Sequence, residues 1–458
     1  MTQWVSANQI RANFSALMSE MYQNEVPLYG DLINLVEDVN QATLNQQPEL
    51  KVQLENTGEL PRLSQERHGA IRLGTAQELS QMRRIFAVMG MQPVGYYDLV
   101  PAGVPVHSTA FRAVNAEDLN QSPFRIFTSL LRLELIENKQ LRQVAEDTLA
   151  KRQIFTAGAL ALTEKFEQQG GLNQEDAQQF VNEVLETFRW HTEAPVTQEV
   201  YQSLHDQHRL IADVVAFKGP HINHLTPRTL DIDAVQTGMQ SRGIPQKAVV
   251  EGPPRRKCPI LLRQTSFKAL KEQVNFSDAQ GSHTARFGEI EQRGVALKAK
   301  GRQLYDELLA KARQLLGRAP DEDNAVQYEQ ILAETFAAFP DDYATLANQE
   351  LAYFYYLPQK NIDYAVTAAD LTTLLAQGIV KIEPIVYEDF LPVSAAGIFQ
   401  SNLGEDGQAQ YQSVSNKDIF EKCLGAKVLN EIELYAQIEQ QSINRCLEQL
   451  NQQIVVKA

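Results

Sequence analysis

The chain has 458 residues, of which 43% are apolar and 22% are charged, and its formal net charge is −15. Such a composition is that of an ordinary globular protein with a large core, and the length indicates more than one structural unit. The acidic balance argues against nucleic acid and anionic membranes as main partners, but it leaves room for a small anionic substrate in a locally basic pocket.

Cysteine usage and hydropathy indicate a cytoplasmic protein. Cys258, Cys423 and Cys446 are far apart and odd in number, so we expect free thiols, with neither a disulfide framework nor a thiolate zinc site. The N-terminus lacks a basic segment followed by an apolar run, so we expect no signal peptide. No stretch approaches the ~18 apolar residues of a membrane span.

We expect residues 1–60 to form an N-terminal helical region. Ile10, Phe14, Leu17 and Met21 recur on one side of this stretch at helical spacing. This periodicity predicts an amphipathic helix that packs its apolar side against the rest of the protein.

The pattern over residues 61–136 predicts a first βαβββ-like module. A strand pattern, a helical pattern and two more strand patterns follow one another in "ERHGAIRLGT" (66–75), "AQELSQMRRIFAVMG" (76–90), "MQPVGYYDLV" (91–100) and "VHSTAFRAV" (106–114). The next stretch, "SPFRIFTSLLRLELI" (122–136), is either a long strand or the start of a helix.

A second βαβββ-like module is expected over residues 214–300, after a helical insertion over 137–213. The second module repeats the order of the first, with a histidine-containing strand, a helix and several strands. These patterns cover residues 219–228, 229–243, 244–252, 258–267 and 284–294. We interpret the two modules as an internal repeat, which changes the expected fold.

Residues 301–458 are expected to form a mostly helical C-terminal region. Strand and loop signals occur at 378–403, a segment that we expect to close the site, and a long amphipathic helix is expected from about 416. The whole pattern predicts an α+β fold with two βαβββ modules in a mixed sheet around a metal site. Large helical insertions and helical N- and C-terminal regions complete it.

The stretch "RFGEIEQRG" (286–294) alternates carboxylates and apolar residues along an expected strand. Glu289 and Glu291 are two positions apart, so their side chains point to the same face. Carboxylates on an inward face need a positive partner, which is an arginine, a lysine or a metal ion. Pairing with Arg286 or Arg293 in a structural network is therefore the alternative to metal binding.

Two strands add candidate histidine ligands. His68 and Arg72 are four apart in "RHGAIR" and share a face, whereas His221 and His224 are three apart in "GPHINHLT" and face opposite ways. Only one of the latter two can point into a shared site. Two inward histidines and one carboxylate make the facial triad of non-haem Fe(II) oxygenases. A lone strand histidine is more often a hydrogen-bonded core or surface residue, so the residues by themselves leave metal binding open.

Other chemistries have weaker support in the sequence. His205 and His208 are three apart in "LHDQHRL", but the polar residues between and beside them indicate a solvated helix face. The patterns of zinc peptidases, dinucleotide-binding loops, P-loops and nucleophile elbows are absent.

The stretch "FGEIEQRG" resembles the last strand of the vicinal-oxygen-chelate superfamily, whose modules are βαβββ. In 4-hydroxyphenylpyruvate dioxygenase the equivalent segment has the form F-x-E-I-x-Q-R, which matches residues 287–293 here. The glutamate of that form is an iron ligand, so the resemblance implies Glu289 rather than Glu291. Likewise "INHLT" resembles the second-module histidine strand of that family, which implies His224 rather than His221.

Nearly the whole chain resembles the bacterial 2-oxoadipate dioxygenase/decarboxylase family, also called hydroxyglutarate synthase. The resemblance rests on "ERHGAIRLGT", "GYYDLVPAGVPVHSTAFR", "FKGPHINHLTPRTLDID", "RFGEIEQRG" and "DFLPVSAAGIFQSNL", in that order. It implies that Fe(II) is bound by three ligands and that the substrate contacts three further residues. The implied ligands are His68, His224 and Glu289, and the implied substrate contacts are Arg72, Val393 and Ser394.

The resemblance also implies the reaction. A non-haem Fe(II) dioxygenase would oxidatively decarboxylate and hydroxylate a 2-oxo diacid, most simply 2-oxoadipate and O2 to 2-hydroxyglutarate and CO2, in lysine catabolism. Two alternatives stay open. One is a non-redox isomerase or lyase of the same superfamily with Zn²⁺ or Ni²⁺, and the other is a non-catalytic interaction protein that binds no metal.

Overall fold

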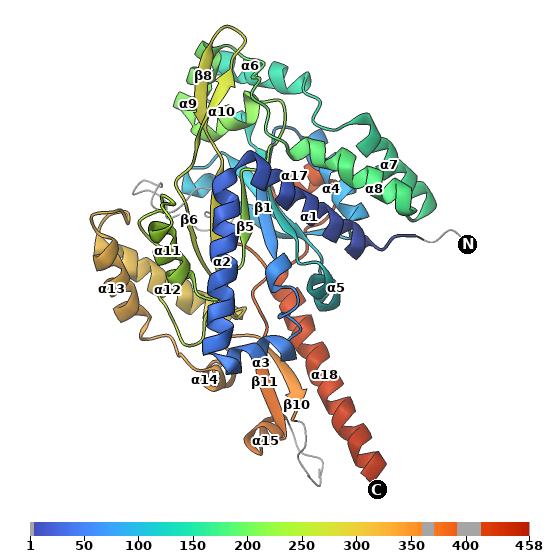
Figure 1. The fold of residues 1–458 in the computed structure, drawn as a ribbon, viewed down its shortest axis with the longest axis vertical. Helices are drawn as coiled ribbons and strands as arrows, with labels where there is room; N and C mark the ends of the chain where they lie inside the picture. Colours follow the sequence, from blue (N-terminus) through green and yellow to red (C-terminus); the bar gives the residue numbers. More distant parts are fainter. Residues whose placement is uncertain (1–3, 360–370, 392–413, 458) are drawn as a thin grey trace.

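The computed structural model describes residues 4–359, 371–391 and 414–457. It is built on a seven-stranded mixed sheet with strand order β2-β3-β4-β1-β5-β9-β6 (Figure 1). None of the described helices is long and apolar enough to cross a membrane.

One half of the sheet is a βαβββ unit. It consists of β1 (Arg67–Leu73), α4 (Ala76–Val88), β2 (Gln92–Asp98), β3 (Val106–Arg112) and β4 (Arg125–Leu131). Strand β1 pairs parallel with β4, and β2, β3 and β4 pair antiparallel in chain order. The stretch after residue 122, which the sequence leaves between strand and helix, is therefore a strand.

The other half repeats this plan in part. It consists of β5 (His224–Pro227), α11 (Ile232–Ser241), β6 (Leu262–Ser266) and β9 (Phe287–Arg293). Strand β5 pairs parallel with β9, and β9 pairs antiparallel with β6. The strand expected at 244–252 is wrong: only isolated bridges at Gln246 and Glu251 join this stretch to the β6 side.

Three other segments lie outside this repeated plan. Strands β7 (Lys271–Asn275) and β8 (Gln280–Thr284) form a separate hairpin. Strands β10 (Phe354–Pro358) and β11 (Val380–Pro384) form a second two-stranded sheet. Short 3-10 segments occur at Leu63–Gln65, Val100–Ala102, Leu133–Leu135 and Glu186–Phe188.

The two halves join where β1 pairs antiparallel with β5. Strands β1, β5 and β9 are thus neighbours in the middle of the sheet. The predicted α+β class, with two βαβββ-like units in one mixed sheet, is confirmed.

Helices precede, interrupt and follow the sheet. The N-terminal helices are α1 (Ala7–Glu25), α2 (Pro27–Gln46) and α3 (Pro48–Asn56). Each of the last two begins at a proline, which favours the first position of a helix and cannot continue the helix before it. The remaining helices are α5 (Ala116–Gln121), α6 (Lys139–Ala150), α7 (Ala157–Gln169), α8 (Gln174–Leu185), α9 (Gln198–Gln207), α10 (Arg209–Val215), α12 (Ala299–Leu316), α13 (Ala325–Phe336), α14 (Tyr343–Asn348), α15 (Leu371–Ala376), α17 (Val414–Leu424) and α18 (Glu431–Lys457).

Side-chain alternation along β1 separates two packed faces. Ile71 and Leu73 belong to a core made with α1, α2, α4, α8 and α11, while Ala70 belongs to a second core with α9, α10 and Phe390. The second core lies on the face that carries His68 and Arg72. Helices α9 and α10 of the insertion therefore cover the face on which the candidate site lies, while α8 packs on the opposite face.

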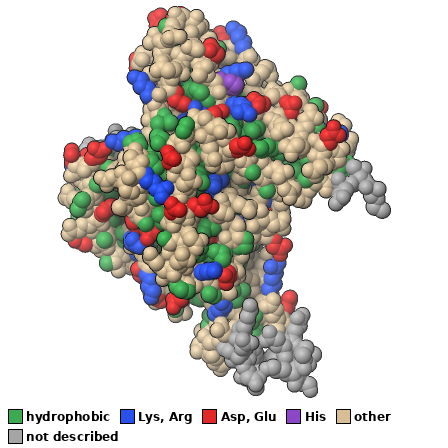
Figure 2. Space-filling model, in the orientation of Figure 1, with side chains coloured by type: hydrophobic (Ala, Val, Ile, Leu, Met, Phe, Trp, Pro, Cys, Tyr) green, Lys and Arg blue, Asp and Glu red, His purple; other side chains and the backbone are tan. Residues whose placement is uncertain are grey.

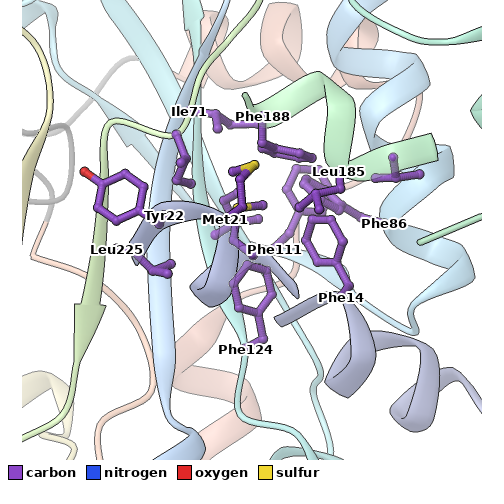
Figure 3. Close-up of a cluster of buried hydrophobic side chains, with 14 of the residues drawn as sticks. Phe14, Met21, Tyr22, Ile71, Phe86, Phe111, Phe124, Leu185, Phe188 and Leu225 are labelled. Carbon is purple, nitrogen blue, oxygen red and sulfur yellow. The ribbon is translucent and has the colours of Figure 1, made fainter. Parts of the chain in front are cut away.

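An aromatic cluster fixes the N-terminal helices on the first face (Figure 3). Phe14 of α1 packs edge-on against Phe124 and Phe188, at ring-centroid distances of 5.5 and 5.4 Å. Phe86 of α4 packs against Phe111 of β3 at 4.9 Å. Such pairs stabilise the packing by ~0.5–1.5 kcal/mol each beyond their buried area.

At the surface, acidic and basic side chains are interspersed over the face drawn in Figure 2.

Candidate metal centre

Three neighbouring strands bring His68, His224 and Glu289 together. Each is fully buried, and one ligand atom from each lies within 4.8 Å of the other two. The Nε2 atom of His68 lies 3.1 Å from Oε1 of Glu289, and Nε2 of His224 lies 3.8 Å from the same oxygen. One metal ion can bridge such a spacing.

The strand register explains why these side chains meet. His68 on β1 lies opposite Thr226 on β5, and His224, two residues earlier on β5, shares that face. On the other side of β5, His224 lies opposite Phe287 of β9, so Glu289 follows two residues later on the same face. The three ligands therefore come from consecutive strands on one face of the sheet.

The side chain of His224 suits a metal ligand. Within the described part of the chain, neither of its ring nitrogens forms a hydrogen bond, although the ring is fully buried. Burial and the charge of His68 hold the pKa of His224 well below its ordinary value, so the ring is neutral, the form that binds metals. A buried polar group without a partner costs ~1–3 kcal/mol, a cost that a bound cation removes.

Glu289 fits the same role. Burial raises the pKa of its carboxyl group. Its Oε1 accepts hydrogen bonds from Thr226 Oγ1 at 3.2 Å and Gln264 Nε2 at 3.0 Å. Its Oε2 is buried and accepts no hydrogen bond from the described residues. Apart from His68, the described partners of this carboxylate are neutral donors, and no arginine among the described residues forms an ion pair with it.

Glu291 pairs with Arg293 and His68 instead of facing an open ligand position. Its two oxygens lie 2.7 and 3.0 Å from Nε and Nη2 of Arg293, and its Oε2 lies 3.1 Å from Nδ1 of His68. Although burial acts in the opposite direction, Arg293 and His68 lower the pKa of Glu291 to about 2. The structural network that the sequence allows for either glutamate is therefore found at Glu291. Arg286, the other arginine considered, pairs with Glu272 and Glu25 instead.

A buried ionic cluster continues behind Glu291. Its ion pairs link Arg62, Glu66, Arg125, Arg228, Glu291, Arg293 and Glu388. Removing one member of a buried ion pair typically costs ~3–5 kcal/mol, because the other charge stays buried without compensation. The cluster therefore ties Glu291 firmly in place behind His68.

A cavity of about 480 Å³ lies near the candidate ligands, although His68, His224 and Glu289 are not among the described residues that line its wall. Its wall includes Phe287, whose ring stacks on His224 with the centroids 4.9 Å apart. Four basic side chains line it, and Asp213 is the one acid among the described residues of its wall. The basic residues are Arg72, Arg209, Lys247 and Lys268. In a protein with a net charge of −15, this local positive charge suits an anionic substrate.

Arg72 lies on this wall, on the same face of β1 as His68. Its Nη1 donates to Oδ2 of Asp213 at 2.5 Å and to Oδ1 of Asn223. The pairing of Arg72 with an acid, which the sequence leaves as the alternative to substrate binding, is thus present, but inside the cavity and not on the surface. Val393 and Ser394 lie outside the described residues.

His221 points away from the metal candidates. Its Nε2 lies 3.3 Å from Oδ1 of Asp213, and its ring packs edge-on against Trp190 at 4.6 Å. Only one histidine of this pair lies with the metal candidates, as expected, but strand parity is not the reason, because β5 begins at His224 and His221 precedes it.

Sequence reasoning missed Thr226 and Gln264, which hold Glu289, and Asp213, which holds Arg72. Asp213 had a readable signal, because it is the single acid in the apolar run "LIADVVAF". A lone charge in such a run is buried and needs a partner. Thr226 and Gln264 had no such signal, since their roles depend on strand pairing.

Known proteins resemble this chain over nearly its whole length. Residues 14–402 match the family model of 2-oxoadipate dioxygenase/decarboxylase. A relative of that name from Pseudomonas putida is 62% identical over 455 residues, which cover 98% of each chain. Another of the same name from Escherichia coli is 56% identical over 447 residues, covering 96% of this chain and 98% of the relative. The crystal structure of the hydroxyglutarate synthase from Pseudomonas putida in complex with 2-oxoadipate aligns with a TM-score of 0.93 at 60% identity, covering 98% of this chain and 100% of that one.

Proposed function

The chain belongs to the 2-oxoadipate dioxygenase/decarboxylase family, and on this premise we propose that it is a non-haem Fe(II) enzyme that converts 2-oxoadipate and O2 to 2-hydroxyglutarate and CO2. The equation balances, since the six-carbon diacid loses one carbon as CO2 and both atoms of O2 enter the products. The observation that carries the proposal is a buried set of two histidines and one glutamate beside a basic cavity.

We propose His68, His224 and Glu289 as the ligands of the iron. Two histidines and one carboxylate are the ligand set of non-haem Fe(II) oxygenases, which keep positions open for substrate and O2. Bound Fe(II) would supply the one-electron oxygen chemistry that amino-acid side chains lack.

The surrounding residues orient these ligands. Oε2 of Glu291 lies 3.1 Å from Nδ1 of His68, and this negative charge favours a proton on Nδ1, which would leave the lone pair of Nε2 for the metal. Thr226 and Gln264 donate to Oε1 of Glu289 and so fix the plane of that carboxylate. Phe390 and Phe287 pack on the two histidine rings, at 4.9 Å each, and keep water from them.

The cavity would hold the diacid. Arg72 is the proposed partner of a substrate carboxylate, because a guanidinium binds a carboxylate through two parallel hydrogen bonds. Lys247 and Arg209 line the same space and add positive charge for a dianionic substrate. Val393 and Ser394 are proposed as further substrate contacts on the basis of the "VSAAG" resemblance alone.

The test is oxygen uptake by the iron-loaded protein. We expect anaerobically purified protein to bind about one Fe(II) per chain and to consume O2 when 2-oxoadipate is added, with equal amounts of O2 used and CO2 and 2-hydroxyglutarate formed. His224→Ala should lose the iron, whereas the matched control His221→Ala should keep it. Turnover with Zn²⁺ or Ni²⁺ and no O2 uptake would favour the isomerase alternative. A folded protein that binds no metal would favour the non-catalytic one.

A further inference from the structure

A carboxylate from the helical insertion contacts Arg72. Asp213 lies on α10, within a run of buried residues, and its side chain is 8% exposed. Its Oδ2 accepts from Nη1 of Arg72 at 2.5 Å. The insertion, which interrupts the two halves of the sheet in sequence, therefore reaches the proposed substrate site.

Asn223 completes the contact from the opposite side. Its Nδ2 donates to the carbonyl oxygen of Ala70 at 3.3 Å, which leaves Oδ1 to accept from Arg72. A guanidinium carries five N–H donors, of which Nη1 carries two. Since Asp213 and Asn223 both accept from Nη1, they fix the plane in which the whole guanidinium lies.

Asp213 is itself held by two histidines. Its Oδ1 lies 2.9 Å from Nε2 of His283 and 3.3 Å from Nε2 of His221. A carboxylate only accepts, so Nε2 of His283 carries the proton, and Nδ1 accepts from the hydroxyl of Tyr201 at 2.8 Å. The chain Tyr201–His283–Asp213–Arg72 thus runs from α9 through the hairpin strand β8 and α10 to β1. Figure 1 shows α9, α10 and β8 gathered at one end of the molecule.

The charge of Asp213 argues for a positioning role. An anion on the wall of a cavity that takes a dianion weakens binding by repulsion. Against the effect of burial, Arg72 and His221 hold the pKa of Asp213 well below its ordinary value, so this repulsion is present at neutral pH. Such a group is expected only where it contributes something that offsets the repulsion, and its contacts with Arg72 supply that.

We propose that Asp213 is a positioning residue for substrate selection, which acts by aiming the guanidinium of Arg72 at a substrate carboxylate. His283, backed by Tyr201, and His221 keep Asp213 in place. The helical insertion and the β7–β8 hairpin therefore contribute to the choice of a dicarboxylic 2-oxo acid. This inference rests on the proposed function, in which Arg72 reads the carboxylate far from the keto group.

The experiment compares two substrates, 2-oxoadipate and 2-oxohexanoate, which have the same length but differ in the distal carboxylate. Asp213→Asn keeps the shape of the side chain but places an N–H donor against either Arg72 or His283. We expect it to lower the ratio of kcat/KM values for 2-oxoadipate over 2-oxohexanoate by roughly 10-fold. The loss should lie mainly in KM, with iron content unchanged. Gln143→Ala, an exposed change on α6 of the same helical insertion, where the side-chain amide donates to Asp147, should leave the ratio unaltered.

A double variant separates positioning from structural damage. If Asp213 acts through Arg72, then adding Asp213→Asn to Arg72→Ala should change the ratio by less than about 2-fold, because the two effects are coupled. His283→Gln, whose Nε2 can still donate to Asp213, should retain more of the ratio than His283→Leu.

The outcomes distinguish this inference from the function on which it rests. Equal losses for both substrates in Asp213→Asn, or full additivity with Arg72→Ala, would overturn the positioning role. A selective loss in Arg72→Ala without one in Asp213→Asn would refute the role of Asp213 alone. No turnover of 2-oxoadipate by the iron-loaded wild type would instead refute the proposed function.

Discussion

At the scale of single residues, two glutamates with the same strand geometry meet different neighbours. Glu289 and Glu291 share a face of β9, but among the described residues only Glu291 of the two is paired with an arginine, Arg293. Burial raises the pKa of Glu289, whereas Arg293 and His68 lower that of Glu291 to about 2 despite burial. Glu289 is therefore the carboxylate whose charge no arginine balances among the described residues, and we expect the metal ion to bind there.

Substitution of these two glutamates should distinguish the metal ligand, Glu289, from the residue that orients His68, Glu291. Glu289→Ala should abolish Fe(II) binding, because it removes one of three ligands and their charge balance. Glu291→Gln should keep the metal but weaken its affinity by roughly 10–100-fold, the usual effect of losing the partner that orients a histidine ligand. Anaerobic metal titration, on samples shown by circular dichroism to be folded, measures both. Retained iron in Glu289→Ala together with complete loss in Glu291→Gln would reverse the assignment.

Substitution of Arg72 should lower activity toward dicarboxylic 2-oxo acids only. A diacid would place its far carboxylate against Arg72, whose side chain is 11% exposed, and loss of a buried charge partner costs ~2–5 kcal/mol. Arg72→Ala should therefore lower kcat/KM for 2-oxoadipate by roughly 10²-fold or more, with iron still bound. Arg72→Lys should recover only part of this, because an ammonium cannot reproduce the planar fork.

Steady-state rates with 2-oxohexanoate provide the control for Arg72. This substrate lacks the distal carboxylate, so we expect it to be poor with the wild type and little affected by Arg72→Ala. Equal losses with both substrates would mean that Arg72 does not read the distal carboxylate, and the orientation proposed for the substrate would be reversed.

At the scale of elements, short strands carry the candidate ligands and helices hold those strands. Strand β5 has four residues and shares two register pairs with β9. The hydroxyl of Tyr22 on α1 lies 2.8 Å from the carbonyl oxygen of Phe287 and 3.1 Å from that of Asn223. A helix from the N-terminus therefore links the starts of β5 and β9, where pairing within the sheet is sparse.

The same substitution in two helices should have opposite effects on stability. Gly30 in α2 has no atom within 4 Å of an added Cβ, so Gly30→Ala should raise the free energy of unfolding by ~0.5–1 kcal/mol, through helix propensity. Gly301 in α12 would place its Cβ 2.0 Å from the carbonyl oxygen of Leu351, a backbone atom that cannot move aside. Gly301→Ala should therefore lower the free energy of unfolding by ~1–3 kcal/mol. Urea unfolding measures both, and stabilisation by both would contradict the close packing of α12.

At the scale of the whole molecule, C-terminal elements pack on the first half of the sheet. Phe420 of α17 packs against His107 of β3, with ring centroids 4.7 Å apart. The amide of Asn416 donates to Oδ2 of Asp98 at 2.7 Å, across a sequence separation of 318 positions. A helix near the C-terminal end of the chain thus covers the β2–β3 edge of the sheet.

The burial of His107 should make stability fall in mild acid. Burial, with Arg132 nearby, lowers the pKa of His107 to about 4, while the unfolded chain protonates this group near ~6.5. Between these values the unfolded state binds more protons, so the contribution of His107 is complete above ~6.5 and is lost as pH falls toward 4. The slope is at most ~1.4 kcal/mol per pH unit.

Urea unfolding of wild type and His107→Gln at pH 7, 6 and 5 measures this contribution. The variant should show a shallower loss of stability over the window, because glutamine does not titrate. Parallel curves for the two proteins would show that His107 is not kept neutral by the packing of α17.

Local patterns in the sequence determined most of the fold. Alternation and helical periodicity marked β1, β2, β3, β5, β6 and β9, because side chains of a strand point alternately to its two faces. The order of these patterns indicated two βαβββ units. The stretch at 244–252 carried a strand-like pattern but lies at the edge of the sheet, where only isolated bridges form. Apolar alternation reports burial, and burial at an edge does not require a paired strand.

Parity along the strands also determined which side chains could share a face, and by itself it made His68, Arg72, Glu289 and Glu291 candidates for one site. Tertiary structure decided what each of them meets. Only the pairing of β1, β5 and β9 places two histidines beside Glu289, and only folding places Arg293 against Glu291 and Asp213 against Arg72. Asp213 is 141 positions from Arg72 in the chain. Local periodicity carries no information about contacts at that separation, because they depend on how whole elements pack.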